Sequence, residues 1–218
     1  QGTIDKFEGD AIIAFWGAPL DLPNHATVAC HATIEMQQRG VELRKMLREQ
    51  NRPLLFTRMG LNSGPVVVGN MGSAERMDYT MMGDVVNLAA RLEGANKFYK
   101  TFSMISGSTY ELAKDDIDSR QLDIIRVVGK NEPVPVHELL ARKNETSGEM
   151  SGVVEQYMKG LKLYQDRNFS DAIAEFEKVL SIDSEDGPSQ TYIKRCGMFL
   201  ESPPEKDWDG VFTFTEKG

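Results

Sequence analysis

Alternation of apolar and polar residues opens the chain and predicts a β-hairpin. Segments 3–7 and 11–16 have a strand-like composition, and a turn at residues 8–10 separates them. Beyond the hairpin the period changes, because apolar residues recur at helical spacing from about residue 24 to residue 49. The pattern therefore predicts one long helix after the hairpin. Further elements are expected as strands at 53–61, 64–69, 77–82, 122–128 and 134–140, and as a helix at 108–114.

A second principal helix is predicted over about 84–93. Asp84 stands where an N-cap residue is expected, and Gly94 stands where a helix commonly ends. Helices and strands thus alternate as far as residue 141. This alternation indicates an α+β domain over residues 1–141, with a mostly antiparallel sheet.

The last third of the chain has a purely helical period. A polar stretch at 142–152 indicates a linker, and residues 153–201 are expected to form helices, followed by a C-terminal tail at 202–218. Gly160, Ala172 and Phe176 have the spacing of a tetratricopeptide repeat. One such repeat plus a helix is too short to bury its own core. We therefore expect this small α-helical segment to pack on the main domain or on another chain.

Composition narrows the class of protein. The chain has 218 residues, of which 40% are hydrophobic and 27% charged, and this balance is typical of a soluble globular protein. A net charge of −8 argues against a nucleic-acid partner. Cys30 and Cys196 fit no metal or disulfide pattern, so a reduced, cytoplasmic setting is expected. No apolar run approaches the roughly 18 residues of a membrane span, and no signal peptide is seen.

Three segments carry the chemistry: 6–10 (KFEGD), 58–64 (RMGLNSG) and 79–93 (YTMMGDVVNLAARLE). In this order, and with the loop 69–73 (GNMGS) between them, they make the chain resemble the catalytic domains of class III adenylate and guanylate cyclases. The resemblance runs from about residue 2 to residue 140. It implies a ferredoxin-like cyclase fold that lacks its first strand and helices here, so the chain is expected to begin inside a longer protein. The residue types resemble most a bacterial subgroup of adenylate cyclases.

Asp10 is the expected metal ligand. A carboxylate just past a hairpin turn suits Mg²⁺, which needs only one or two protein carboxylates when phosphates supply the other oxygens. The same carboxylate could instead accept a hydrogen bond within the turn. The resemblance implies two Mg²⁺ or Mn²⁺ ions per site and a second aspartate in a Phe-x-Asp-Ile-like segment, which this sequence lacks. We therefore expect this chain alone to be nearly inactive, since two metals need more than one aspartate.

Asn87 and Arg91 are the expected catalytic pair. They lie four residues apart, on one face of the predicted helix, near the positive N-terminal end that suits a triphosphate. The resemblance implies that Asn87 orients the ribose and that Arg91 binds the α-phosphate, for which a rigid, always charged fork is well suited. The alternative is an ordinary polar face on an amphipathic helix.

Four further residues complete the expected substrate site. Lys6 can only donate and the Thr80 hydroxyl can accept, so together they complement the edge of adenine rather than that of guanine. Thr80 could equally be an ordinary strand residue. The resemblance implies that Arg58 binds the β- and γ-phosphates and that Lys130 makes a loop contact with phosphate. Arg58 could instead be a surface charge at the end of a strand.

The resemblance implies that ATP is converted to 3′,5′-cyclic AMP and pyrophosphate. It also implies a head-to-tail homodimer with composite sites. In such a dimer Asp10 and Arg58 come from one protomer, and the other protomer supplies Lys6, Thr80, Asn87 and Arg91. Three alternatives stay open. They are a guanylate cyclase, a nucleotide-binding regulator without catalysis, and an interaction module built on the helical segment.

Overall fold

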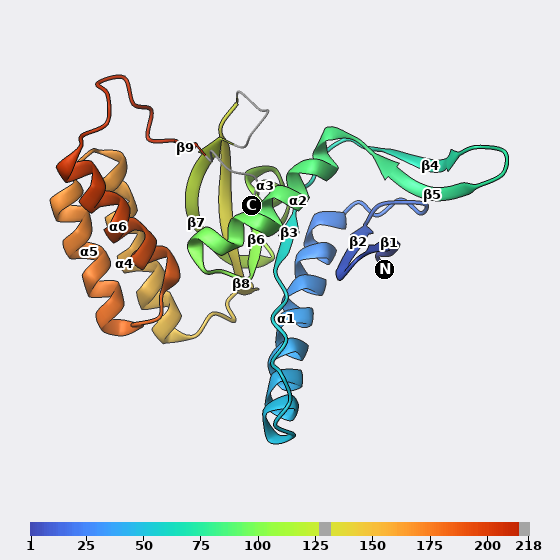
Figure 1. Cartoon of the computed structure of the whole chain (residues 1–218), viewed down its shortest axis with the longest axis horizontal. Helices are drawn as coiled ribbons and strands as arrows, with labels where there is room; N and C mark the ends of the chain where they lie inside the picture. The colour runs from blue at the N-terminus through green and yellow to red at the C-terminus, as the bar shows by residue number, and fades with distance from the viewer. Residues whose placement is uncertain (127–131, 214–218) are drawn as a thin grey trace.

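The computed structural model describes residues 1–126 and 132–213, and its centre is a five-stranded sheet (Figure 1). Across the sheet the strand order is β3-β6-β8-β7-β9. The central pairs β6–β8 and β7–β8 are antiparallel, whereas the outer pairs β3–β6 and β7–β9 are parallel. The strands are β3 (Met59–Leu61), β6 (Ser103–Ser106), β7 (Ile117–Arg126), β8 (Val134–Arg142) and β9 (Phe212–Thr213).

Two antiparallel ribbons stand apart from this sheet. The first ribbon pairs β1 (Thr3–Glu8) with β2 (Ala11–Phe15), and the second ribbon pairs β4 (Val67–Gly72) with β5 (Met77–Met82). Both project from the same side of the molecule, at the right of Figure 1. The predicted hairpin is therefore confirmed, but it forms its own two-stranded sheet instead of joining the central one.

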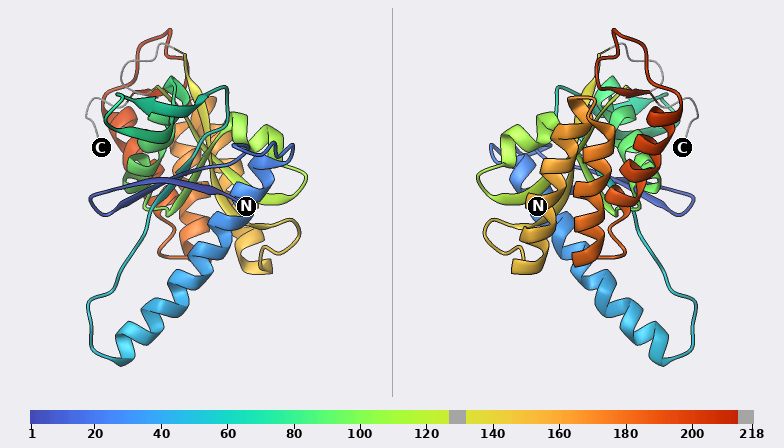
Figure 2. Two further views of the ribbon diagram at one scale, coloured as in Figure 1. Left: turned by 90° about the vertical axis from the view of Figure 1, so that its right-hand side faces the viewer. Right: turned by 90° about the vertical axis from the view of Figure 1, so that its left-hand side faces the viewer.

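The core has two layers, one on each face of the sheet, and neighbouring residues of β6 contribute to different layers. Met104 faces a cluster that contains Leu92 of α2 (Asp84–Tyr99). Its neighbour Ile105 faces the other cluster, where Cys30 of α1 (His25–Glu49) and Ala113 of α3 (Gly107–Ala113) are buried. Because successive strand side chains point to opposite faces, α2 covers one face of the sheet while α1 and α3 cover the other. The far end of α1 and the segment after it reach away from the body (Figure 2).

The C-terminal helices pack on the face that α2 covers. They are α4 (Gly148–Gln165), α5 (Phe169–Ile182) and α6 (Gly187–Glu201), here called the helical unit. Tyr157, Phe176 and Tyr192 share one buried cluster with Leu122 of β7. A Cβ on Gly160 would lie 2.7 Å from the Phe176 ring, so α4 and α5 meet where the repeat-like spacing placed them. The helical unit thus packs on the main domain, which is one of the two positions that we expected.

Several boundaries differ from the sequence prediction. The strand expected at 53–61 is formed only at Met59–Leu61, and the strand expected at 64–69 lies at Val67–Gly72. The short, fully buried strand β6 was missed because a strand buried on both faces shows no alternation. Helix α4 begins at Gly148, inside the predicted linker.

Helix α2 was predicted to end at Gly94, but it continues to Tyr99. Its C-cap is Lys100, which has the left-handed conformation. Asp84 is the first helical residue and Gly83 is the N-cap. A glycine within a helix is disfavoured by about 1 kcal/mol relative to alanine. Gly94 is buried, and the helix continues because its packing outweighs that local preference. Within the described part of the chain, no helix has both the length and the apolar character to cross a membrane.

Candidate functional site

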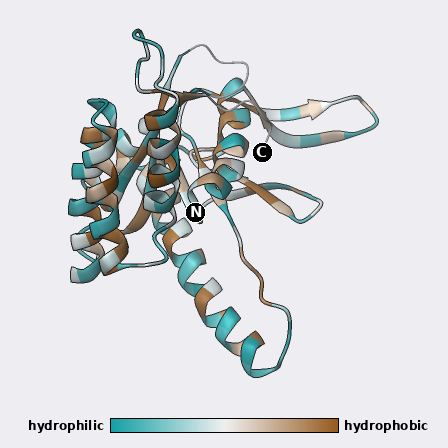
Figure 3. Ribbon diagram, turned by 60° about the vertical axis from the view of Figure 1, so that its left-hand side comes forward, coloured by the Kyte–Doolittle hydropathy of each residue, from teal (hydrophilic) through white to brown (hydrophobic). Residues whose placement is uncertain are grey.

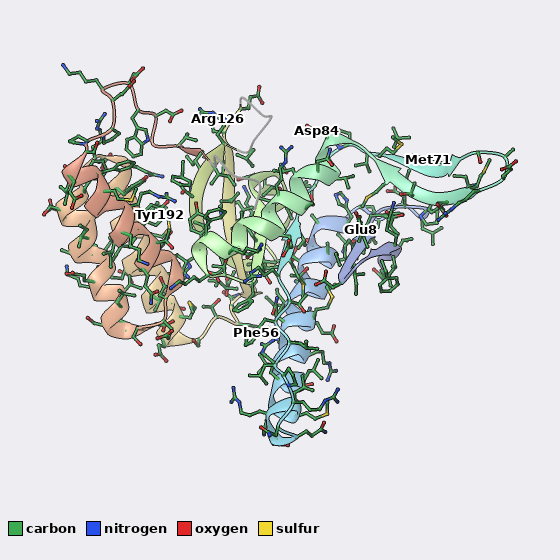
Figure 4. The ribbon with its side chains drawn as sticks, in the orientation of Figure 1. Glu8, Phe56, Met71, Asp84, Arg126 and Tyr192 are labelled. Carbon is green, nitrogen blue, oxygen red and sulfur yellow. The ribbon has the colours of Figure 1, made fainter. Side chains whose placement is uncertain are left out.

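The first ribbon carries two of the predicted site residues. Lys6 lies on β1 and is exposed, with its ammonium 3.6 Å from the Asp5 carboxylate. Asp10 lies in the turn between β1 and β2, where its carboxylate is exposed to solvent. Glu8, labelled in Figure 4, marks the tip of this ribbon, on the same side of the molecule as Met71 of the second ribbon.

The second ribbon carries Thr80, which is half-buried on β5 opposite Gly69 of β4. The two ribbons meet through the rings of Phe15 and Tyr79, whose centroids are 6.1 Å apart. The structure thus brings the strands of Lys6 and Thr80 to neighbouring positions. Among the described residues, however, no hydrogen bond joins these two side chains.

Helix α2 begins directly after the second ribbon and carries Asn87 and Arg91 (Figure 1). Asn87 is exposed and Arg91 half-buried, one turn further along the helix. Arg58 is exposed immediately before β3. Within residues 1–126 and 132–213, neither arginine forms an ion pair or a side-chain hydrogen bond. Both guanidinium groups are therefore available to an anionic ligand.

Gly60 fixes the distance between α2 and β3. A Cβ on this residue would lie 2.3 Å from the carbonyl oxygen of Ala89 and 2.3 Å from the amide nitrogen of Glu93. Only a glycine permits this approach. The helical turn that contains Arg91 therefore packs directly on β3, the strand that follows Arg58. The motif segment 58–64 contained this glycine, but the sequence alone gave it no role.

Two asparagines also join α2 to β3 and the loop after it, and the sequence alone gave neither of them a role. The Asn62 amide donates to the carbonyl oxygen of Val85 at 2.9 Å, which ties the loop after β3 to the first turn of α2. The Asn96 amide donates to the carbonyl oxygen of Met59 at 3.0 Å, near the other end of the helix. Asn62 lies within the quoted motif. Asn96 carries no sequence signal, because a buried asparagine inside a helix looks like a surface residue.

The described residues provide few ligands for a metal ion. They contain no cluster of three or more His, Cys, Asp or Glu side chains suited to a metal ion. The single free carboxylate of Asp10 fits a Mg²⁺ ion that also binds nucleotide phosphates, but one carboxylate is too few to clamp two ions. Lys130, the expected phosphate contact, lies outside the described residues.

Apolar side chains are exposed along both ribbons. In Figure 3 the ribbon is coloured toward brown at apolar residues. Phe7 and Val67, one on each ribbon, are each 68% exposed. Large apolar surfaces of this kind commonly mark contacts with another protein. The other residues of this exposed set are Ile4, Ile12, Met77 and Met82.

Comparison with known proteins agrees with this arrangement. The family model described as "Adenylate and Guanylate cyclase catalytic domain" matches residues 5–141. Adenylate cyclase 1 of Rhizobium meliloti (strain 1021) is 37% identical over 140 residues, which cover 64% of this chain and 21% of that protein. The terminal-differentiation specific adenylate cyclase of Dictyostelium discoideum is 32% identical over 199 residues, 89% of this chain and 9% of that protein. The second match is longer than the matched domain and extends into the helical unit.

Two solved structures are similar over the same region. The adenylyl cyclase CyaB from P. aeruginosa superposes with a TM-score of 0.59 at 36% identity and covers 67% of this chain and 75% of that one. The guanylyl cyclase Cya2 gives a TM-score of 0.58 at 32% identity and covers 67% of this chain and 73% of that one. The chain spans about a fifth or less of the length of the two relatives above. On the match over residues 5–141, the chain belongs to the family of adenylate and guanylate cyclase catalytic domains.

Proposed function

We propose that this protein is an adenylate cyclase, which converts ATP to 3′,5′-cyclic AMP and pyrophosphate. The observation that carries the proposal is the pair Asn87 and Arg91, held one turn apart on a helix that Gly60 seats against β3. Arg91 has no ion-pair partner in the described part of the chain, so its charge can meet a phosphate. Together with the family match, this arrangement supports nucleotide cyclisation.

In the proposed reaction the ribose 3′-oxygen attacks the α-phosphorus in line. A new P–O bond forms, the bond to the pyrophosphate oxygen breaks, and the hydroxyl releases its proton to solvent water. Asn87 orients the ribose, Arg91 stabilises the negative charge that develops on the α-phosphoryl group, and Arg58 binds the β- and γ-phosphates. Asp10 would hold Mg²⁺ or Mn²⁺, and such an ion favours ionisation of the hydroxyl and neutralises phosphate charge. Lys130 is proposed as a further phosphate contact.

The proposed active unit is a homodimer with composite sites. The exposed apolar residues on both ribbons support this proposal, since a second copy would cover them. Asp10 and Arg58 from one protomer would then face Lys6, Thr80, Asn87 and Arg91 of the other. A reducing, cytoplasmic setting is also proposed, because the Cys30 and Cys196 thiols are both free.

Adenine is the proposed base because of Lys6 and Thr80. Lys6 would donate to the acceptor at adenine N1, and the Thr80 hydroxyl would accept from the exocyclic amine. Guanine reverses both groups and would leave buried polar atoms unpaired. The similarity to the guanylyl cyclase Cya2 makes GTP the alternative substrate that an experiment has to test.

The test measures kcat/KM for ATP and GTP in the full-length protein and in a double variant, Lys6→Glu with Thr80→Cys. The glutamate offers an acceptor to guanine N1–H, and the thiol is a weak donor toward O6. Each mismatched contact should cost about 1–3 kcal/mol, or roughly tenfold to a hundredfold in discrimination. We expect wild type to prefer ATP and the double variant to lose ATP turnover far more than GTP turnover. An unchanged ATP/GTP ratio would refute these two roles, and no turnover of either nucleotide by wild type would refute the cyclase proposal.

A further inference from the structure

The C-terminal end of α2 is built directly onto the helical unit. A Cβ on Gly187, the first residue of α6, would lie 2.4 Å from the carbonyl oxygen of Tyr99, so the two helices meet backbone to backbone. The Thr191 hydroxyl donates to the carbonyl oxygen of Phe98 at 2.8 Å. The helix that carries Asn87 and Arg91 therefore ends against α6 rather than in solvent.

A buried polar cluster joins α2, β7 and α6 at the same place. The Tyr99 hydroxyl and the Arg195 guanidinium both donate to Oδ2 of Asp123, each at 2.6 Å. Tyr99 is 0%, Asp123 2% and Arg195 5% exposed. Burial disfavours the charge on Arg195, but interactions with Tyr99, Asp123 and other neighbours outweigh it and raise the pKa well above its usual value. Asp123 thus receives one hydrogen bond from each helix.

A second buried ion pair fixes the start of α6. The Asp186 carboxylate caps this helix by accepting from the Ser189 amide at 3.0 Å. It also lies 2.6 Å from the Arg120 guanidinium, which donates to Glu138 at 2.7 Å. Since Arg120 and Glu138 belong to β7 and β8, the N-terminus of α6 is tied to the centre of the sheet.

The apolar core continues across the same boundary. Leu88 and Leu92 of α2 belong to one buried cluster with Tyr157 of α4 and Tyr192 of α6. Figure 4 shows Tyr192 within the helical unit, whereas Asp84 marks the opposite, ribbon end of α2. The sheet face therefore has a single core, to which the helical unit and α2 both contribute.

From these contacts we infer that Tyr99, Asp123 and Arg195 are positioning residues that set where α2 stands on the sheet, and through it the placement of Asn87 and Arg91. The inference rests on the proposed cyclase function for its catalytic consequence. Arg91 lies eight residues before Tyr99, about 12 Å along the helix, so a tilt or slide at the buried end displaces the guanidinium. The helical unit is then part of the catalytic structure and not a separate appendage.

The experiment compares two substitutions of the same kind in the full-length protein. Tyr99→Phe removes the hydroxyl that α2 contributes to Asp123 and keeps the ring. The matched control, Tyr157→Phe, removes an equally buried hydroxyl of α4, which donates to the carbonyl oxygen of Leu122 at 2.9 Å. Both variants lose one buried hydrogen bond, but only the first loses a contact of α2.

Two readouts are measured on both variants: amide hydrogen exchange of peptides from residues 84–99, and kcat and KM for ATP. A misplacement near 1 Å can reduce a rate by about a hundredfold. For Tyr99→Phe we expect exchange in α2 to rise about tenfold and kcat to fall about tenfold or more, with KM changed less than about twofold, because Arg91 acts mainly on the developing charge. Tyr157→Phe should leave α2 exchange and kcat within about twofold of wild type.

The outcomes separate this inference from the proposed function. Equal effects of both variants on α2 exchange, or no effect of Tyr99→Phe, would overturn the inference even if wild type turned over no nucleotide. An active wild type whose kcat is unchanged by Tyr99→Phe would overturn the positioning role and leave the cyclase function intact. Arg195→Lys, which keeps the charge, should retain more activity than Arg195→Gln, and equal loss in the two would also count against it.

Discussion

Gly60→Ala tests the contact on which the candidate site depends. The added methyl carbon would lie 2.3 Å from both the Ala89 oxygen and the Glu93 nitrogen, whereas ordinary contacts begin at 3.4 Å. Because both atoms belong to the backbone of α2, no side-chain rotation relieves the overlap, and the helix must retreat by about 1 Å. Overpacking of this kind costs about 1–3 kcal/mol. We expect the free energy of unfolding to fall by about 2–3 kcal/mol and Tm to fall by about 5–10 °C.

Stability is measured by urea denaturation followed by circular dichroism. ATP turnover is measured in the full-length protein, at a temperature where the variant is folded. Since α2 carries Asn87 and Arg91, a 1 Å retreat should also lower kcat by about a hundredfold. Gly69→Ala on β4 is the matched control, because an added Cβ there meets nothing within 4 Å. It should change stability by less than about 0.5 kcal/mol. A Gly60→Ala protein as stable and as active as Gly69→Ala would refute this account of the α2–β3 contact.

Two further predictions concern acid stability and the shared site. His137 stacks on Tyr110, and its burial lowers its pKa to about 4. Because the unfolded chain takes up this proton at about pH 6.5, the free energy of unfolding should fall as pH falls from about 6.5 through 4. Between pH 7.5 and pH 5 the loss should be about 2 kcal/mol. Urea unfolding at both pH values should show this loss in wild type and in His31→Gln but not in His137→Phe. In the full-length protein Asp10→Ala and Arg91→Ala should each abolish cyclase activity, and mixing the two should restore part of it through one intact site per heterodimer. Heterodimers that form without any recovery would argue against composite sites.

The sequence predicted those parts of the fold that local pattern determines. The long helix was expected at about 24–49 and is found at His25–Glu49, because its apolar period is continuous. The turn with Asp10, the strand with Thr80 and the helix with Asn87 and Arg91 were also placed on the correct kind of element. The motifs that carry these residues are short and sit at element boundaries, where turn and cap preferences are strong.

The remaining features depend on contacts between distant segments. Gly94 was taken as a helix end, but it is a buried residue within α2, which continues to Tyr99. Asn96 bonds a carbonyl group 37 residues away, and Arg195 bonds a carboxylate 72 residues away. No periodicity or spacing rule connects such pairs, so neither the support of α2 nor its junction with the helical unit could be predicted from one sequence.

The junction between α2 and the helical unit is polar, and a stability argument alone does not explain why. A buried ion pair adds little net stability compared with well-packed apolar side chains of the same volume, because both charges must first lose their water. An apolar contact, however, tolerates small slides of one helix along another, whereas the hydrogen bonds from Tyr99 and Arg195 to Asp123 weaken when their distances and angles change. Helix α2 follows the exposed second ribbon at its first turn and has this cluster at its last. If, as proposed, the first turns of α2 contact a nucleotide and a second protomer, the buried polar cluster at its last turn keeps the helix in a fixed position on the sheet.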